Sequence, residues 1–125
     1  MSASSAFFKQ INIAAKLRFN FIVSGEQTVF SKQEELFIYR IILELVHNII
    51  NHAGASEASV QLIYYSDHLE IMVEDNGIGF DAPTTDGIGL KNVQSRVSYL
   101  HGFMNIDSNR HGTTIVINIP INRKK

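Results

Sequence analysis

The chain has 125 residues, which is enough for one domain with a sizeable core but not for two. Hydrophobic residues make up 45% of it and charged residues 18%, as in an ordinary soluble globular domain. The formal net charge of -1 argues against a protein that binds nucleic acid by neutralising phosphates. Because the chain has no cysteine, disulfides and thiolate metal sites are excluded.

Neither a signal peptide nor a membrane span is predicted. The segment from Met1 to Ala6 is small and polar, and it lacks a charged region followed by an apolar one. The most apolar stretch, Leu36 to Ile50, is interrupted by Arg40 and Glu44 and is too short to cross a bilayer. We therefore expect a cytoplasmic domain, on its own or as the cytoplasmic part of a membrane-bound protein, that itself makes no contact with a membrane.

In the first third of the chain, the residue patterns predict a short helix, a strand and a long helix. Apolar residues from Ser5 to Lys16 recur at helical spacing, whereas Leu17 to Val23 alternates apolar and polar residues like a strand. Ser31, followed three residues later by a glutamate, predicts a capping box. A long helix should follow it and end near Asn51 or His52.

In the rest of the chain, the residue patterns predict two β-hairpins separated by a second helix. That helix is indicated by apolar residues at a three-to-four spacing, namely Leu90, Val93, Val97 and Leu100. It should end at His101-Gly102, where the glycine can adopt the left-handed conformation. The strands of the hairpins are predicted over Ala58 to Tyr65, Leu69 to Glu74, Phe103 to Ser108 and Thr113 to Ile119.

This order of elements favours an α+β fold. Strands that come in adjacent pairs, rather than alternating singly with helices, predict a two-layer α/β sandwich. Its mixed, mostly antiparallel sheet should carry the helices on one face. A doubly wound nucleotide fold is disfavoured, because the chain contains no Gly-x-Gly-x-x-Gly or Walker A sequence.

The long helix is apolar nearly all round but carries one polar stripe, formed by Arg40, Glu44, His47, Asn48, Asn51 and His52. One interpretation is a solvent face on which Arg40 and Glu44 form an ion pair. Another is a Mg²⁺ and water-handling pair, since a carboxylate and an amide lie one turn apart. Zinc is disfavoured, because His47 and His52 are neither three nor four residues apart.

Two glycine-containing segments lie between the first hairpin and the second helix. Asp75-Asn76-Gly77-Ile78-Gly79-Phe80 follows a predicted strand, and Gly87-Ile88-Gly89-Leu90 precedes the helix. An acidic residue that closes a strand, followed by glycines that let the backbone approach a ligand, indicates a phosphorylated or purine ligand. Taken alone, the first segment is also ordinary turn chemistry.

Together these segments resemble the ATP-binding catalytic domain of bacterial sensor histidine kinases, within the GHKL (Bergerat-type) ATPase superfamily. The segment from Glu44 to Ala53 is similar to the family's N box, and the two glycine segments are similar to its glycine boxes. Gly112-Thr113-Thr114 resembles its closing Gly-Thr element. The short segment from Asp81 to Asp86 and the helix start from Gly89 to Val97 resemble the branch of nitrate-sensor-like and lipid-fluidity-sensor-like kinases.

The resemblance implies a role for individual residues. Asp75 would accept a hydrogen bond from the adenine amino group, and Asn48 would hold Mg²⁺. Glu44 is the candidate catalytic residue, as a base or a group near the metal, although it could also only pair with Arg40. The remaining residues implied to bind ATP are Asn51, His52, Gly77, Ile78, Gly79, Gly87, Ile88, Gly89, Leu90 and Thr113.

The match departs from the family at one position of the N box. Asn51 stands where the family usually has lysine or arginine, so the affinity for phosphate should be reduced. His52, Lys91 or Arg96 are the candidates to compensate for that lost charge.

No phosphoacceptor motif is visible in the chain, so the resemblance implies partners. Residues 17–125 would be the ATP-binding domain, and residues 1–16 a connector from a dimerisation domain that bears the histidine. Downstream of that domain, the resemblance implies a response regulator. We expect a monomer in isolation and a homodimer in the parent protein. Two alternatives stay open, namely an anti-sigma-factor-like serine kinase and a catalytically silent nucleotide-binding module.

Overall fold

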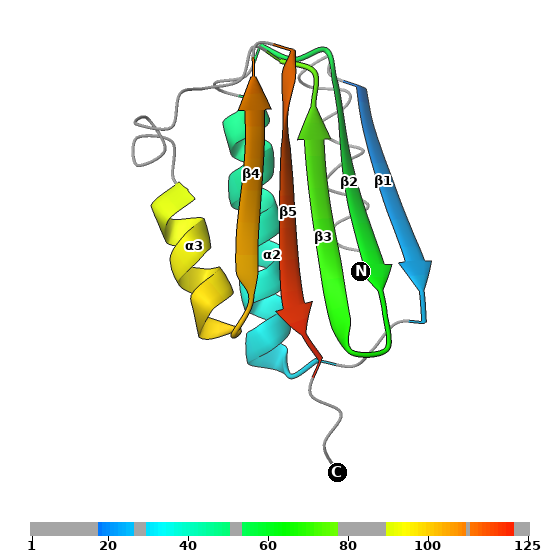
Figure 1. The fold of residues 1–125 in the computed structure, drawn as a ribbon, viewed down its shortest axis with the longest axis vertical. Helices are drawn as coiled ribbons and strands as arrows, with labels where there is room; N and C mark the ends of the chain where they lie inside the picture. Colours follow the sequence, from blue (N-terminus) through cyan, green and yellow to red (C-terminus); the bar gives the residue numbers. More distant parts are fainter. Residues whose placement is uncertain (1–17, 27–29, 51–53, 78–89, 110, 122–125) are drawn as a thin grey trace.

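The computed structural model describes residues 18–26, 30–50, 54–77, 90–109 and 111–121. The predicted connector helix over Ser5 to Lys16 therefore lies outside the described residues. Within them the elements follow in the predicted order (Figure 1), as β1 (Arg18–Gly25), α2 (Lys32–Asn48), β2 (Glu57–Tyr64), β3 (His68–Asp75), α3 (Leu90–Tyr99), β4 (Phe103–Asn109) and β5 (Gly112–Pro120).

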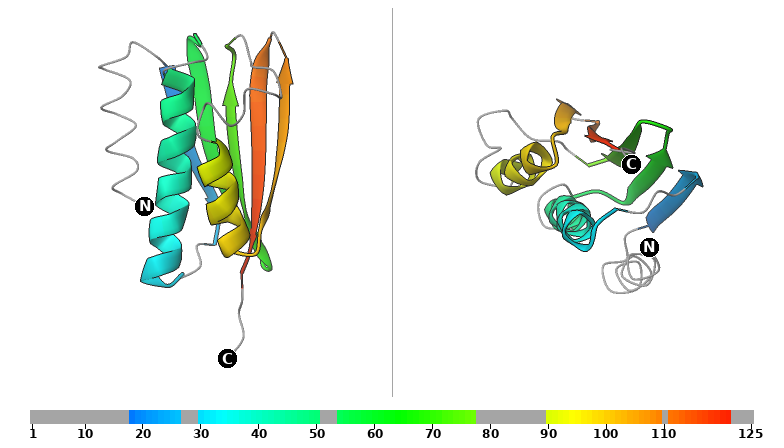
Figure 2. Two further views of the ribbon diagram at one scale, coloured as in Figure 1. Left: turned by 90° about the vertical axis from the view of Figure 1, so that its left-hand side faces the viewer. Right: turned by 90° about the horizontal axis from the view of Figure 1, so that it is seen from below.

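The strands form one five-stranded sheet with the order β1-β2-β3-β5-β4. β1 and β2 are parallel, because α2 connects them, and the other neighbouring pairs are antiparallel. Both helices cover the same face of the sheet (Figure 2), which gives two layers. The predicted α+β sandwich with a mixed, mostly antiparallel sheet is confirmed.

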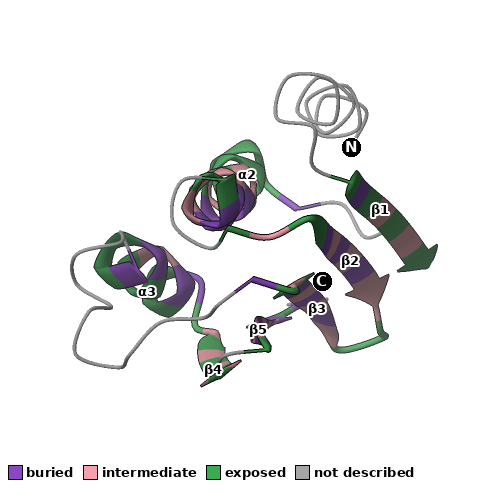
Figure 3. Cartoon of the chain, turned by 90° about the horizontal axis from the view of Figure 1, so that it is seen from above, coloured by how far each residue is buried: buried purple, intermediate pink, exposed green. Residues whose placement is uncertain are grey.

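The core lies between the helices and the covered face of the sheet. Alternate residues of β2, β3 and β5 are buried, as expected for strands with one covered face. The side of α2 that faces the sheet is buried (Figure 3) through Ile38, Ile41, Ile42, Leu45 and Val46. Neither helix in the described ranges has the length and apolar character needed to span a bilayer.

Helix α2 begins as the sequence predicts. The Ser31 hydroxyl accepts a hydrogen bond from the Glu34 backbone N–H at 3.1 Å, and the Glu34 carboxylate accepts one from the Ser31 N–H at 2.9 Å. This reciprocal pair satisfies two backbone donors and stabilises the helix by about 1 kcal/mol. The regular helix ends at Asn48, although Ile49 keeps helical backbone angles. Residues 51–53, where the end was predicted, lie outside the described ranges.

The predicted left-handed glycine at the end of α3 is wrong. His101 adopts that conformation, with φ of 63°, and Gly102 does not. The Gly102 N–H donates to the Val97 carbonyl and the His101 N–H to the Ser98 carbonyl, both at 2.9 Å, which is the Schellman arrangement. Gly102 is needed for another reason, because a Cβ there would overlap the carbonyl oxygen of Asn118.

Candidate functional site

The end of α2, the end of β3 and the start of β5 lie at the same end of the molecule (Figure 1). This arrangement brings together three of the segments singled out in the sequence. α2 supplies Glu44 and Asn48, β3 supplies Asp75, and β5 supplies Thr113. The fold therefore gathers residues that lie far apart in the chain.

Asp75 is the last residue of β3, and its carboxylate is partly buried. Its Oδ1 accepts a hydrogen bond from the Gly77 backbone N–H at 2.8 Å, so the turn that follows the strand orients the carboxylate. Burial raises the pKa of Asp75 above its ordinary value, and the hydrogen bond from Gly77 partly offsets that rise. The result is an oriented acceptor with spare lone pairs next to a buried glycine.

Thr113 lies directly opposite Asp75 in the pairing of β3 with β5, and it is the one buried polar residue of the described core. Its hydroxyl lies 2.8 Å from the hydroxyl of Ser108 on β4. Sequence reasoning missed Ser108. The sequence did contain a signal for it. Ser108 lies two residues after Ile106 and four after Met104, so the strand period puts its polar side chain on the same inward face of β4 as those two apolar residues.

Gly112 explains how β5 comes so close to the end of β3. It has φ of 148°, and a Cβ at this position would overlap the carbonyl oxygen of Asp75 and lie 3.3 Å from the Asn76 Cα. Only glycine fits both the backbone conformation and the spacing. The Gly-Thr element thus contributes two things to the site, namely a close backbone approach and the Thr113 hydroxyl.

Asn48 lies at the last turn of α2 and is partly buried. Its amide nitrogen is buried and has no hydrogen-bond partner among the described residues. A buried donor of this kind is costly unless an acceptor, such as a water or a phosphate oxygen, completes it. The amide oxygen is a ligand type that Mg²⁺ accepts. Asn48 therefore fits a position beside a hydrated magnesium–phosphate group.

Glu44 is partly buried one turn before Asn48, whereas Arg40 is exposed. None of the ion pairs found among the described residues joins these two side chains. The predicted Arg40–Glu44 ion pair is therefore not found, whereas the exposure of Arg40 and His47 agrees with a solvent face over part of the stripe. The Glu44 carboxylate is left without that partner.

Among the remaining predicted nucleotide contacts, the structure describes Leu90. Leu90 begins α3 and is 2% exposed, so it packs in the core. The predicted contacts Asn51, His52, Ile78, Gly79, Gly87, Ile88 and Gly89 lie outside the described residues.

A depression of about 420 Å³ lies on the other, uncovered face of the sheet at this end of the molecule. Its lining includes the carboxylates Glu57, Glu74 and Asp107, and it reaches Asp75 and Thr113 at the strand ends. Three carboxylates would repel a triphosphate, so this depression is a poor nucleotide site. Strand alternation places Asp75 and Thr113 in the series of residues that face the helices, so the helix-covered side, which also has Asn48, is the candidate.

The chain is similar in sequence to known proteins and in fold to solved structures. The chain is 32% identical over 112 residues to the sensor histidine kinase MctS of Rhizobium johnstonii, covering 81% of this chain and 24% of that protein. It is 31% identical over 119 residues to the signal transduction histidine-protein kinase/phosphatase DegS of Bacillus subtilis, covering 90% and 31%. The histidine kinase AdeS of Acinetobacter baumannii superposes with a TM-score of 0.76 at 19% identity, covering 94% of this chain and 61% of that one.

The chain thus spans only 24% and 31% of the length of these two relatives. The family model described as histidine kinase-, DNA gyrase B- and HSP90-like ATPase matches residues 33–123, which include every described residue of the site. The family suggested by the N box and the glycine boxes is therefore confirmed. This chain belongs to the histidine kinase-, DNA gyrase B- and HSP90-like ATPases.

Proposed function

We propose that this chain is the Mg·ATP-binding catalytic domain of a two-component sensor histidine kinase. The observation that carries the proposal is the oriented, partly buried Asp75 carboxylate opposite the buried Thr113 hydroxyl. The kinase assignment, rather than another ATPase of the family, is supported by the relatives named histidine kinases at 31–32% identity.

Asp75 would recognise the adenine base. Its carboxylate can accept a hydrogen bond from the exocyclic amino group while it keeps the bond from Gly77. In guanine the corresponding position carries a carbonyl, so two acceptors would face each other in a partly desolvated site. The Thr113 hydroxyl, oriented by Ser108, would support the base site, directly or through water. The site would therefore discriminate ATP from GTP.

Asn48 would hold the metal end of the nucleotide. The bound Mg²⁺ would neutralise negative charge on the triphosphate. The buried amide nitrogen of Asn48 would gain the acceptor that it lacks among the described residues. Gly87 and Gly89, which directly precede α3, would offer backbone N–H groups to the phosphates at the start of that helix.

In the transfer step, the bond between the γ-phosphorus and the β,γ-bridging oxygen breaks, and a phosphorus–nitrogen bond to an imidazole forms. ADP leaves, and the imidazole loses a proton. The chain's contribution would be positioning and charge neutralisation. The partly buried Glu44 carboxylate, which does not pair with Arg40, is available to take that proton or to order water near the metal.

The acceptor would be a histidine on a dimerisation domain, and a response regulator would receive the phosphoryl group afterwards. This proposal implies a domain that works in the cytoplasm, where ATP is available, and a homodimeric parent protein.

Incubation with γ-labelled ATP, Mg²⁺ and a dimerisation domain encoded in the same gene tests the proposal. We expect acid-labile label on a histidine of that domain, and none when the chain carries Asp75→Asn. Label on a serine of an antagonist protein would instead identify an anti-sigma-factor-like kinase. Nucleotide binding without transfer to either acceptor would identify a silent binding module.

A further inference from the structure

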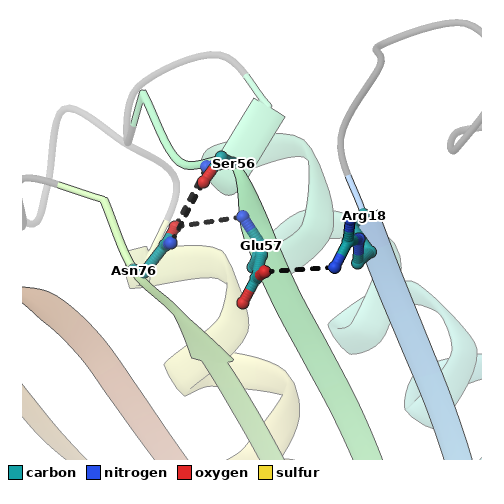
Figure 4. Close-up of polar contacts among 4 residues, drawn as sticks. All are labelled: Arg18, Ser56, Glu57 and Asn76. Carbon is teal, nitrogen blue, oxygen red and sulfur yellow. Dashed lines mark hydrogen bonds and ion pairs between the residues drawn. The ribbon is translucent and has the colours of Figure 1, made fainter.

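Asn76, the residue after β3, uses both ends of its side-chain amide to hold the start of β2 (Figure 4). Its Oδ1 accepts hydrogen bonds from the backbone N–H groups of Ser56 and Glu57, both at 3.0 Å. Its Nδ2 donates to the Ser56 hydroxyl at 3.1 Å. Its own backbone N–H donates to the Glu57 carbonyl, also at 3.1 Å. One residue is thus tied to two consecutive residues of a segment about twenty positions away.

The orientation of this amide follows from chemistry. Backbone N–H groups can only donate, so the Asn76 atom that faces both of them must be the oxygen. The nitrogen then points at the Ser56 hydroxyl, which can accept. Both polar atoms of the side chain therefore have a partner. In the flipped orientation the amide nitrogen, a donor, would face the two backbone N–H groups, which are donors as well.

The position of this tether in the chain links it to the base site. Ser56 and Glu57 belong to the segment that follows α2, and Asn76 stands between Asp75 and Gly77. The tether sets the direction in which the chain leaves the sheet after β3. That direction decides whether the Gly77 N–H reaches the Asp75 carboxylate, which it meets at 2.8 Å.

We propose that Asn76 is a positioning residue for adenine recognition by Asp75. This inference rests on the proposed function. Asn76 touches no reacting atom, and its side chain acts through the backbone that orients the carboxylate.

The exposure of Asn76 distinguishes positioning from a general structural role. If the side chain is truncated, water can satisfy the amides of Ser56 and Glu57, and the backbone bond from Asn76 to Glu57 remains. The global fold should therefore lose little stability. The turn from Asp75 to Gly77 should lose its fixed direction, and with it the preference for adenine.

The test is titration of purified variants with Mg·ATP and with Mg·GTP, together with thermal melts. Asn76→Ala should weaken Mg·ATP binding about tenfold, equal to about 1.4 kcal/mol, while Mg·GTP binding changes little. Asn76→Asp keeps an acceptor for both amides and should restore most of the affinity for ATP. Two controls should keep the wild-type ratio of affinities. Arg18→Ala removes the exposed ion pair with Glu57, and Ile117→Val costs core packing far from the turn.

Three results would overturn the inference. The first is a wild-type affinity of Asn76→Ala for Mg·ATP. The second is a loss of Mg·ATP affinity in Ile117→Val equal to that in Asn76→Ala, because lower stability alone would then explain the weaker binding. Failure of Asn76→Asp to restore ATP binding is the third. An Asp75→Asn variant separates the failure of the proposed function from the failure of the role of Asn76. If it loses ATP while Asn76→Ala does not, only the role of Asn76 fails. If the wild type binds no ATP, the proposed function fails and the role of Asn76 fails with it.

Discussion

Gly112→Ala should damage both the stability of the domain and its nucleotide site. The glycine φ of 148° is a conformation that costs a residue with a side chain about 1–3 kcal/mol. The new Cβ would also overlap the Asp75 carbonyl oxygen, so the ends of β3 and β5 must separate at a cost of about 1–3 kcal/mol. The two costs together come to about 4 kcal/mol. For a domain of this size that cost should lower Tm by about 16 °C, at about 4 °C per kcal/mol.

Gly54→Ala is the matched control. Gly54 also has a positive φ, of 63°, but a Cβ there would meet no atom within 4 Å. It should cost about 1 kcal/mol from backbone strain alone. Thermal melts and Mg·ATP titration of both variants measure the difference. Because Asp75 must move only in Gly112→Ala, only that variant should also lose ATP affinity. Equal melting temperatures, or undisturbed ATP binding in Gly112→Ala, would refute the reasoning.

Three further predictions concern the same site. Burial raises the pKa of Asp75 in the folded state above its ordinary value of 3.8, so the folded protein binds the proton more tightly than the unfolded chain does. The stability that this proton contributes is therefore complete below pH 3.8 and is lost as the pH rises through the raised pKa. Asp75→Asn should therefore raise Tm at pH 7 without ligand but not below pH 3.8, and melts across pH check this. Ser108→Ala should weaken ATP binding and cost about 1 kcal/mol in melts, because the Thr113 hydroxyl loses its partner. Asn51→Lys should strengthen Mg·ATP binding by adding positive charge, and an unchanged Kd would count against this.

Local patterns were sufficient to predict the elements of the fold. Ser31 and Glu34 signal the start of α2 within four residues of sequence, and both hydrogen bonds are found. Alternating residues in β2, β3 and β5 signal the covered face, because burial there follows the period of the strand. These features depend on neighbours in the chain, so the sequence contains the information directly.

The errors and omissions arise from contacts between distant segments. Gly102 looked like the left-handed residue, but the Asn118 carbonyl of β5 occupies the space that a side chain would need, and His101 takes that conformation. Asn76 looked like a turn residue, and its partners Ser56 and Glu57 become neighbours only when β2 pairs with β3. Such pairings depend on the register of the sheet, which local patterns do not specify.

The central claim is that Asp75 makes this domain selective for adenine nucleotides. Isothermal titration of the wild-type chain with Mg·ATP, with Mg·GTP in a parallel experiment, tests it most directly. The account predicts saturable binding of one Mg·ATP per chain and binding of Mg·GTP that is weaker by about tenfold or more, equal to about 1.4 kcal/mol. Equal affinity for the two nucleotides, or no binding of Mg·ATP, would contradict it.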